Sequence, residues 1–255
     1  MNNWKENNIS RNNKRKERIG SIFNNSHGRK YVVTEYKSAH DVLVEFECGF
    51  SVKVEWKAAR QGYISHPLDK TVYGVGVLGF GEFTSNSFDG KLYGTWQRML
   101  RRCYGDQNKE TYIGVTVCDE WHNFQNFCGW AVEQEGFQED SWHLDKDLLS
   151  GTNQKIYSPD TCCFLPIEIN MVIQGKKSDN GLPQGVVLDK RRSLYFSSAI
   201  KGEDNKFLGY SKNPEECFAK YKHAKEKIVK DIAFKWKDKI SNVAYDALLK
   251  FEVQS

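Results

Sequence analysis

The sequence lacks a long apolar segment. None of its 255 residues belongs to a run approaching the roughly eighteen apolar residues that a membrane helix needs. The first thirty residues are polar and basic, unlike a secretory signal. We therefore expect neither a secreted nor a membrane protein, and the predicted location is cytoplasmic.

Cysteine is sparse and irregularly placed. There are 7 cysteines, an odd number, and no Cys-x-x-Cys pair. This usage favours a reducing compartment and gives structural zinc little support. Mixed ligation by Cys103, Cys118, Cys128 and His122 is an open alternative, but ordinary half-buried thiols are favoured.

A complete nucleotide-binding signature is also missing. Gly74, Gly76 and Gly79 fit the pattern G-x-G-x-x-G, but neither a helical stripe nor a P-loop lysine follows them. We predict a glycine-rich linker over residues 69–94 and no small-molecule cofactor.

Net charge is small overall but unevenly distributed. The chain carries +4, which divides into +5 for residues 1–68, −7 for residues 69–170 and +6 for residues 171–255. Basic flanks suit a polyanion, and an acidic centre suits a metal. A chance distribution of solvated charge fits equally well, so motifs must decide.

The hydrophobic patterning predicts an α+β protein. Residues 1–18 read as a flexible basic tail, residues 19–68 as a small antiparallel β domain with period-two strands, and residues 95–178 and 180–255 as two further domains. A helix over residues 91–103 carries Arg101 and Arg102 away from its apolar stripe, which makes them candidates for phosphate contact.

Two short strands and a helix are predicted between residues 143 and 170. They form the ββα outline of a small metal site. Residues 185–210 contain three further strand-like segments, and a helix follows with Asn213 as its N-cap and Pro214 in its first position. Because that helix has one apolar stripe, it can pack on one sheet face and leave the other free.

The central motifs resemble bacteriophage proteins described as HNH endonuclease-like. They run W-x-x-M-x-x-R-C-Y from residue 96, Y-x-G-V-x-V-C-x-E-W from residue 112, L-D-K-D from residue 144 and Y-S-P-D-T-C from residue 157. By this resemblance Asp145 is the metal-bound carboxylate, Asn170 is the second metal ligand, on the helix, and Thr161 holds the place of the Asn that steadies the hairpin. Mg²⁺ is the expected ion.

The residue expected to act as general base departs from that pattern. Lys146 stands where the family has a histidine, and lysine holds its proton at neutral pH and is a poor base. His143 shares the strand face of Asp145 and is a substitute base, although a structural histidine is the commoner outcome. Asp147 and Tyr157 are weaker substitutes.

Residues 185–224 resemble the AP2 DNA-binding domain of phage homing endonucleases and plant transcription factors. The matching positions include Gly185-Val186, Leu208-Gly209-Tyr210 and the helix start at Pro214. The resemblance implies a sheet in the major groove of double-stranded DNA, with these residues facing it: Lys190, Arg191, Arg192, Tyr195, Ser197, Lys201 and Lys206.

Together these resemblances imply a phage-encoded homing or nicking endonuclease that hydrolyses DNA with a divalent ion in the host cytoplasm. The alternative is a catalytically inactive DNA-binding or regulatory protein with a degenerate HNH site, as Lys146 suggests. A structural or interaction protein acting through the N-terminal β domain is the third possibility.

Overall fold

The computed structural model describes residues 17–106, 112–150, 154–174, 181–201 and 204–254. They form two compact units, Met1–Gly81 and Glu82–Ser255, which we treat separately. The predicted α+β class is confirmed. The predicted basic tail lies outside the described residues except at its end, where the Arg18 guanidinium carbon lies 4.6 Å from the Trp56 ring centroid.

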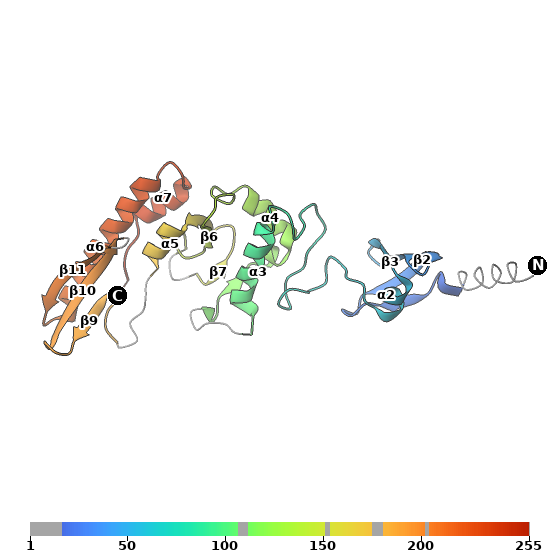
Figure 1. Cartoon of the computed structure of the whole chain (residues 1–255), viewed down its shortest axis with the longest axis horizontal. Helices are drawn as coiled ribbons and strands as arrows, with labels where there is room; N and C mark the ends of the chain where they lie inside the picture. The colour runs from blue at the N-terminus through green and yellow to red at the C-terminus, as the bar shows by residue number, and fades with distance from the viewer. Residues whose placement is uncertain (1–16, 107–111, 151–153, 175–180, 202–203, 255) are drawn as a thin grey trace, which may run out of the picture. The chain divides into compact units, whose positions relative to one another are not determined.

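The first unit is a four-stranded antiparallel meander with strand order β1-β2-β3-β4, followed by one short helix (Figure 1). Its elements are β1 (Ile22–Asn24), β2 (Lys30–Ser38), β3 (Asp41–Phe46), β4 (Ser51–Val54) and α2 (Trp56–Gln61). Alternating residues of β2 and β3, among them Tyr31, Val33 and Val44, are buried against Ala59 of α2. The period-two pattern therefore predicted this sheet correctly.

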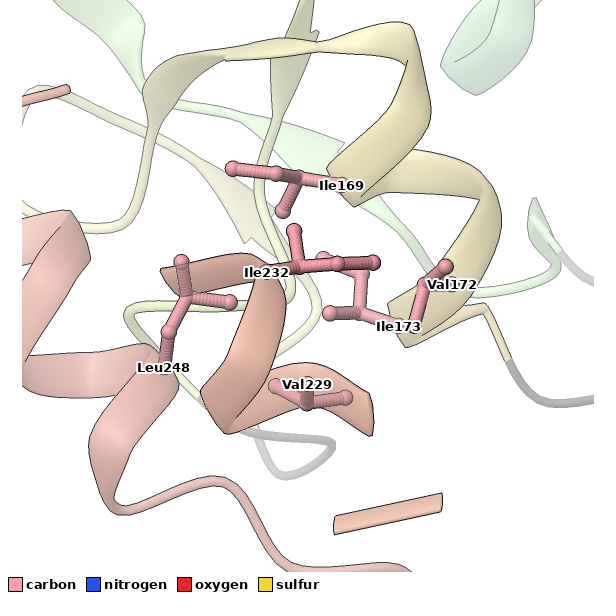
Figure 2. A pocket seen from close by; sticks show the side chains of 6 residues that line it. All are labelled: Ile169, Val172, Ile173, Val229, Ile232 and Leu248. Carbon is pink, nitrogen blue, oxygen red and sulfur yellow. The ribbon is translucent and has the colours of Figure 1, made fainter. Parts of the chain in front are cut away.

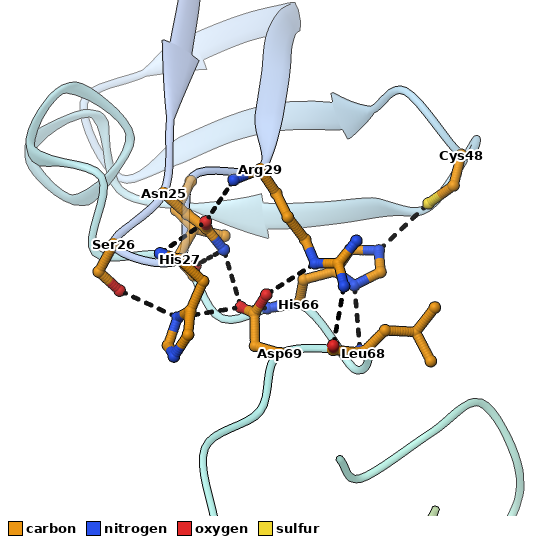
Figure 3. A network of polar contacts seen from close by, with 9 residues as sticks. Asn25, Ser26, His27, Arg29, Cys48, His66, Leu68 and Asp69 are labelled. Carbon is orange, nitrogen blue, oxygen red and sulfur yellow. Dashed lines mark hydrogen bonds and ion pairs between the residues drawn. The ribbon is translucent and has the colours of Figure 1, made fainter. Parts of the chain in front are cut away.

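A buried carboxylate fastens the segment after α2 to the turn between β1 and β2 (Figure 3). Asp69 is 2% exposed. It accepts hydrogen bonds from Arg29 Nε at 2.8 Å, Asn25 Nδ2 at 2.7 Å and the His66 amide at 2.8 Å. Residue 69 is thus part of this unit, and the predicted linker of residues 69–94 is divided between the two units.

The central part of the second unit contains the predicted strand, strand and helix. Its elements are α3 (Lys91–Tyr104), β5 (Thr116–Val117), the 3-10 helix η2 (Asp119–His122), α4 (Phe124–Val132), β6 (Trp142–Asp145), β7 (Ile156–Tyr157), β8 (Cys163–Pro166) and α5 (Ile167–Ile173). β6 pairs antiparallel with β8, and α5 follows β8 directly. β5 pairs in parallel with β7.

The C-terminal part is a three-stranded antiparallel sheet of order β11-β10-β9, packed on a long helix. Its elements are β9 (Val186–Asp189), β10 (Leu194–Lys201), β11 (Asp204–Ser211), α6 (Pro214–Trp236) and α7 (Asn242–Leu249). Asn213 caps α6 as predicted, because its side chain accepts a hydrogen bond from the Glu215 amide.

One apolar core joins the central and C-terminal parts. Ile169 of α5 packs with Ile232 of α6 and Leu248 of α7, and Figure 2 shows these side chains pointing toward one another. The regions predicted as separate domains on either side of residues 178–180 therefore belong to one unit.

Within the described ranges, we find no helix with both the length and the apolar character required to cross a membrane.

Candidate functional site

The turn between β9 and β10 presents three cations to solvent. Lys190, Arg191 and Arg192 are all exposed. Asp189 shapes the turn, because its Oδ1 accepts hydrogen bonds from the backbone amides of Arg191 at 3.0 Å and Arg192 at 3.3 Å. Asp189 thus fixes the backbone of the turn, and the long side chains of the turn remain available to a ligand.

These three cations differ in the contacts that they make within the protein. Arg192 Nε lies 3.8 Å from Asp189 Oδ2, and its guanidinium carbon lies 4.8 Å from the Tyr210 ring centroid. Lys190 and Arg191 form no ion pair with another described residue. They are therefore the turn's best candidates for phosphate contact.

The other two predicted cations lie on the neighbouring strands. Lys206, on β11, is exposed, but it pairs across the sheet with Ala199, which places it on the side of the sheet that α6 covers. Lys201 ends β10, but its side chain lies outside what the structure describes.

The prediction that Ser197 faces DNA is wrong. Ser197 is 0% exposed, and it pairs across the sheet with Val186, which is 2% exposed. Alternation along β10 places Tyr195, Ser197 and Ala199 on the face that α6 covers. Tyr195, although half-buried rather than enclosed, is on that covered face too.

The open face of the sheet instead carries aromatic residues that the sequence analysis did not select. Phe196 pairs with Tyr210 of β11 on one side and Val187 of β9 on the other. Phe207 joins them and is 54% exposed. Period-two alternation does not predict this cluster, because Phe207 and Tyr210 are three residues apart in β11 and share a face only through the register shift between Ser197 and Ser198.

In the central region, Asp145 ends β6 and organises the turn that follows. Its Oδ1 accepts hydrogen bonds from the amides of Asp147 at 3.1 Å and Leu148 at 2.9 Å. Burial raises the pKa of the Asp145 carboxyl, and these amide bonds oppose the rise. One carboxylate oxygen is thus committed to structure.

Lys146 is largely buried beside a carboxylate. It is 8% exposed and its ammonium forms an ion pair with Asp147. The same ammonium lies 5.9 Å from the Tyr157 ring centroid. Because this ammonium is already engaged by a carboxylate, Lys146 is placed to hold charge rather than to contact a water nucleophile.

The substitute bases His143 and Tyr157 differ in their exposure to solvent. His143 is exposed on β6, on the strand face of Asp145, with Leu165 as its cross-strand partner. Tyr157 is 2% exposed, and burial raises its pKa. Of the two, only His143 is open to solvent water.

Asn170 brings an unpaired oxygen to the region. It lies on α5, is 7% exposed, and its Oδ1 has no hydrogen-bond partner in the described structure. No hydrogen bond joins Asn170 to Asp145 among the described residues. Thr161 steadies the neighbouring turn by donating to the Ile156 carbonyl oxygen at 2.8 Å.

These donors suit Mg²⁺ better than zinc. Across the residues with described positions, no group of three or more His, Cys, Asp and Glu could hold a metal ion. Mg²⁺ needs only one or two protein oxygens, because water and substrate phosphates complete its shell. From the sequence, Asp145 and Asn170 are expected to supply two such oxygens.

The thiols considered for mixed ligation are kept protonated by their surroundings. Burial raises the pKa of Cys103 to about 11 and of Cys128 to about 12, and it raises that of Cys118 as well. His122 Nε2 lies 3.1 Å from the Tyr104 hydroxyl.

Arg101 and Arg102 lie in the last turn of α3, and both are exposed. The Arg102 guanidinium carbon lies 5.7 Å from the Tyr112 ring centroid, and the guanidinium also interacts with the Tyr157 side chain. Arg101 therefore keeps the greater freedom to contact phosphate.

No protein-family model, curated protein or solved structure matches this chain.

Proposed function

We propose that this chain binds DNA through the three-stranded sheet in the C-terminal part of its second unit. The observation that carries the proposal is the exposed cationic turn at Lys190 and Arg191. This turn lies at one end of a sheet that has one face covered by α6 and the other face open. Cations that replace the counterions of a phosphate backbone give affinity that falls steeply with salt.

Salt dependence tests this directly. We would measure binding of the full chain to a labelled DNA duplex by fluorescence anisotropy between 50 and 300 mM salt. The double variant Lys190→Ala/Arg191→Ala should lower the slope of log K against log salt by about 1.8, since each phosphate contact contributes about 0.9.

A matched control removes the same charge from elsewhere in the unit. Lys227 and Lys230 are exposed on α6, the helix that packs on the covered side of the sheet. Lys227→Ala/Lys230→Ala should leave the slope nearly unchanged. A duplex affinity insensitive to salt, or equal losses in the two double variants, would count against binding at the turn.

A second candidate function is hydrolysis of the DNA backbone in the central region. The observation favouring it is the buried, unpartnered Asn170 Oδ1 on the helix that follows the β6–β8 hairpin. Asp145 and Asn170 would hold a divalent ion, which supplies charge stabilisation at a scissile phosphate. His143 is the residue placed to take a proton from water, and Lys146 and Asp147 neutralise each other nearby.

Supercoiled plasmid incubated with Mg²⁺ distinguishes a nicking enzyme from a non-catalytic regulator. Asp145→Asn keeps an Oδ1 acceptor for the turn and removes the charge, so nicking should fall while folding is retained. Asp160→Asn, at an exposed carboxylate of the neighbouring turn, is the control. Nicking that persists in Asp145→Asn would contradict this site, and tight DNA binding without nicking by the unaltered protein would favour the regulator.

A further inference from the structure

The open face of the C-terminal sheet is an aromatic surface. The ring centroids of Phe207 and Tyr210 lie 5.2 Å apart, those of Phe196 and Tyr210 5.7 Å, and those of Phe196 and Phe207 6.2 Å. Phe207 is 54% exposed and the adjoining Val187 47%. The three rings therefore form one contiguous cluster with solvent access.

Cations border this cluster. Arg192 lies against Tyr210, and Lys190 and Arg191 extend from the turn between β9 and β10. An apolar face bordered by positive charge is complementary to a polymer that has flat aromatic groups on a phosphate backbone.

The side chains of this face are not of the kind that recognises base pairs in double-stranded DNA. Duplex recognition uses guanidinium or amide groups directed at base edges, because the base faces are stacked against one another. The described side chains of the open face are Val187, Asp189, Leu194, Phe196, Ser198, Phe207 and Tyr210. Asp189 is already bonded to the Tyr210 hydroxyl at 3.1 Å. Exposed rings gain contact only with bases whose faces are free.

We infer that this open face binds unpaired nucleotides of DNA, stacking bases on Phe207 and its neighbouring rings while Lys190 and Arg191 contact the phosphates. This inference rests on the proposed DNA binding and specifies the form of DNA that the sheet takes. It also gives a role to the aromatic positions that the resemblance left unassigned.

The test compares one sequence in two forms. Labelled 20-nucleotide single strands and the corresponding duplex would be titrated with the full chain at the same salt concentration. The single strand should bind more tightly. Phe207→Ala should weaken single-strand binding about 5- to 150-fold, as expected for the loss of one stacked base, while the salt slope stays constant.

Phe234→Ala is the matched control, because Phe234 is a 62% exposed phenylalanine on α6. It should leave both affinities unchanged. Phe207→Trp guards against a folding defect: it should retain binding and show saturable quenching of its fluorescence by the single strand.

The outcomes separate this inference from the proposed function. Duplex binding that equals or exceeds single-strand binding, or a Phe207→Ala loss equal for both forms, overturns the inference and leaves DNA binding standing. Absence of binding to either form overturns both. Equal or tighter binding of an RNA strand with the same sequence overturns the assignment to DNA.

Discussion

Replacing Ser197 by alanine tests whether this residue belongs to the core or to a DNA surface. Ser197 is fully buried between the sheet and α6, and its hydroxyl oxygen has no hydrogen-bond partner in the described structure. A buried hydroxyl without a partner has lost its hydrogen bonds to water and gained none in return. Its removal should therefore stabilise the folded protein.

The size of the effect follows from two opposing contributions. An unsatisfied buried hydroxyl costs about 1–3 kcal/mol. The void left by one oxygen atom is smaller than a methyl group and costs less than about 1 kcal/mol. We expect Ser197→Ala to raise the free energy of unfolding by about 1 kcal/mol, which corresponds to about 2–4 °C in the melting temperature of a unit of this size.

Hydrogen exchange of β10 amides in the full chain measures this change locally. Ser198→Ala is the control: Ser198 is half-buried on the open face, so its replacement should change stability by less than about 0.5 kcal/mol. DNA affinity should be the same for Ser197→Ala and the unaltered protein. Faster exchange in Ser197→Ala, or weaker DNA binding with unchanged exchange, would show that the hydroxyl has a partner and refute the reasoning.

Three further predictions concern stability. Gly185 has φ +73 and a Cβ there would lie 2.4 Å from the Tyr221 ring, so Gly185→Ala should lower the free energy of unfolding, measured by chemical denaturation, by about 2–5 kcal/mol. Gly114 has φ +75 but open space around it, so the control Gly114→Ala should lower that free energy by only about 1–2 kcal/mol. Equal losses in the two variants would exclude the clash with Tyr221. Burial lowers the pKa of His66, and the nearby positive charge of Arg29 lowers it further. The unfolded state therefore binds more protons than the folded state, and the first unit should lose stability as the pH falls below about 6.5. Hydrogen exchange of β3 amides should show this loss, and a His66→Gln variant with the same pH dependence would contradict it. Hydrogen bonding from Lys235 chiefly lowers the pKa of Glu168, but the pair is exposed, so Glu168→Gln should cost at most about 1 kcal/mol at pH 7. The difference should shrink as the pH falls below the ordinary glutamate pKa of about 4.3 and vanish below the lowered pKa of Glu168 in the folded protein. A difference that persists after Glu168 is protonated would exclude the ion pair as its cause.

The sequence predicted most elements because their signals are local. The stripe over residues 91–103 predicted α3, and Asn213 with Pro214 predicted the start of α6. Alternating apolar residues predicted β2 and β3. Each signal depends only on neighbouring residues, so no knowledge of the tertiary arrangement was needed.

The faces of β10 were assigned incorrectly because the usual relation between apolarity and burial is reversed there. Ser197 and Ala199 lie beneath α6, and Gly209 lies opposite Ser197. Small residues let the helix approach the sheet closely, so the polar-looking side of the strand is the buried one. The larger Phe196 faces outward. Only the position of α6 reveals this choice, and the sequence of β10 does not contain it.

The same packing has a consequence for the candidate metal site. Ile169 belongs to the core shared by α5 and α6, and Glu168 binds Lys235 and Trp236 at 2.7 and 3.0 Å. Asn170, next in the chain, therefore lies in the same packed unit as the sheet. If a DNA strand lies on the open face, its distance from Asn170 is set by this core and not by a linker. Sequence composition suggested a domain boundary at residues 178–180, which would have left that distance free. In the packed unit, a substitution that loosens the α5–α6 contact should impair the proposed nicking activity while leaving the affinity for DNA intact.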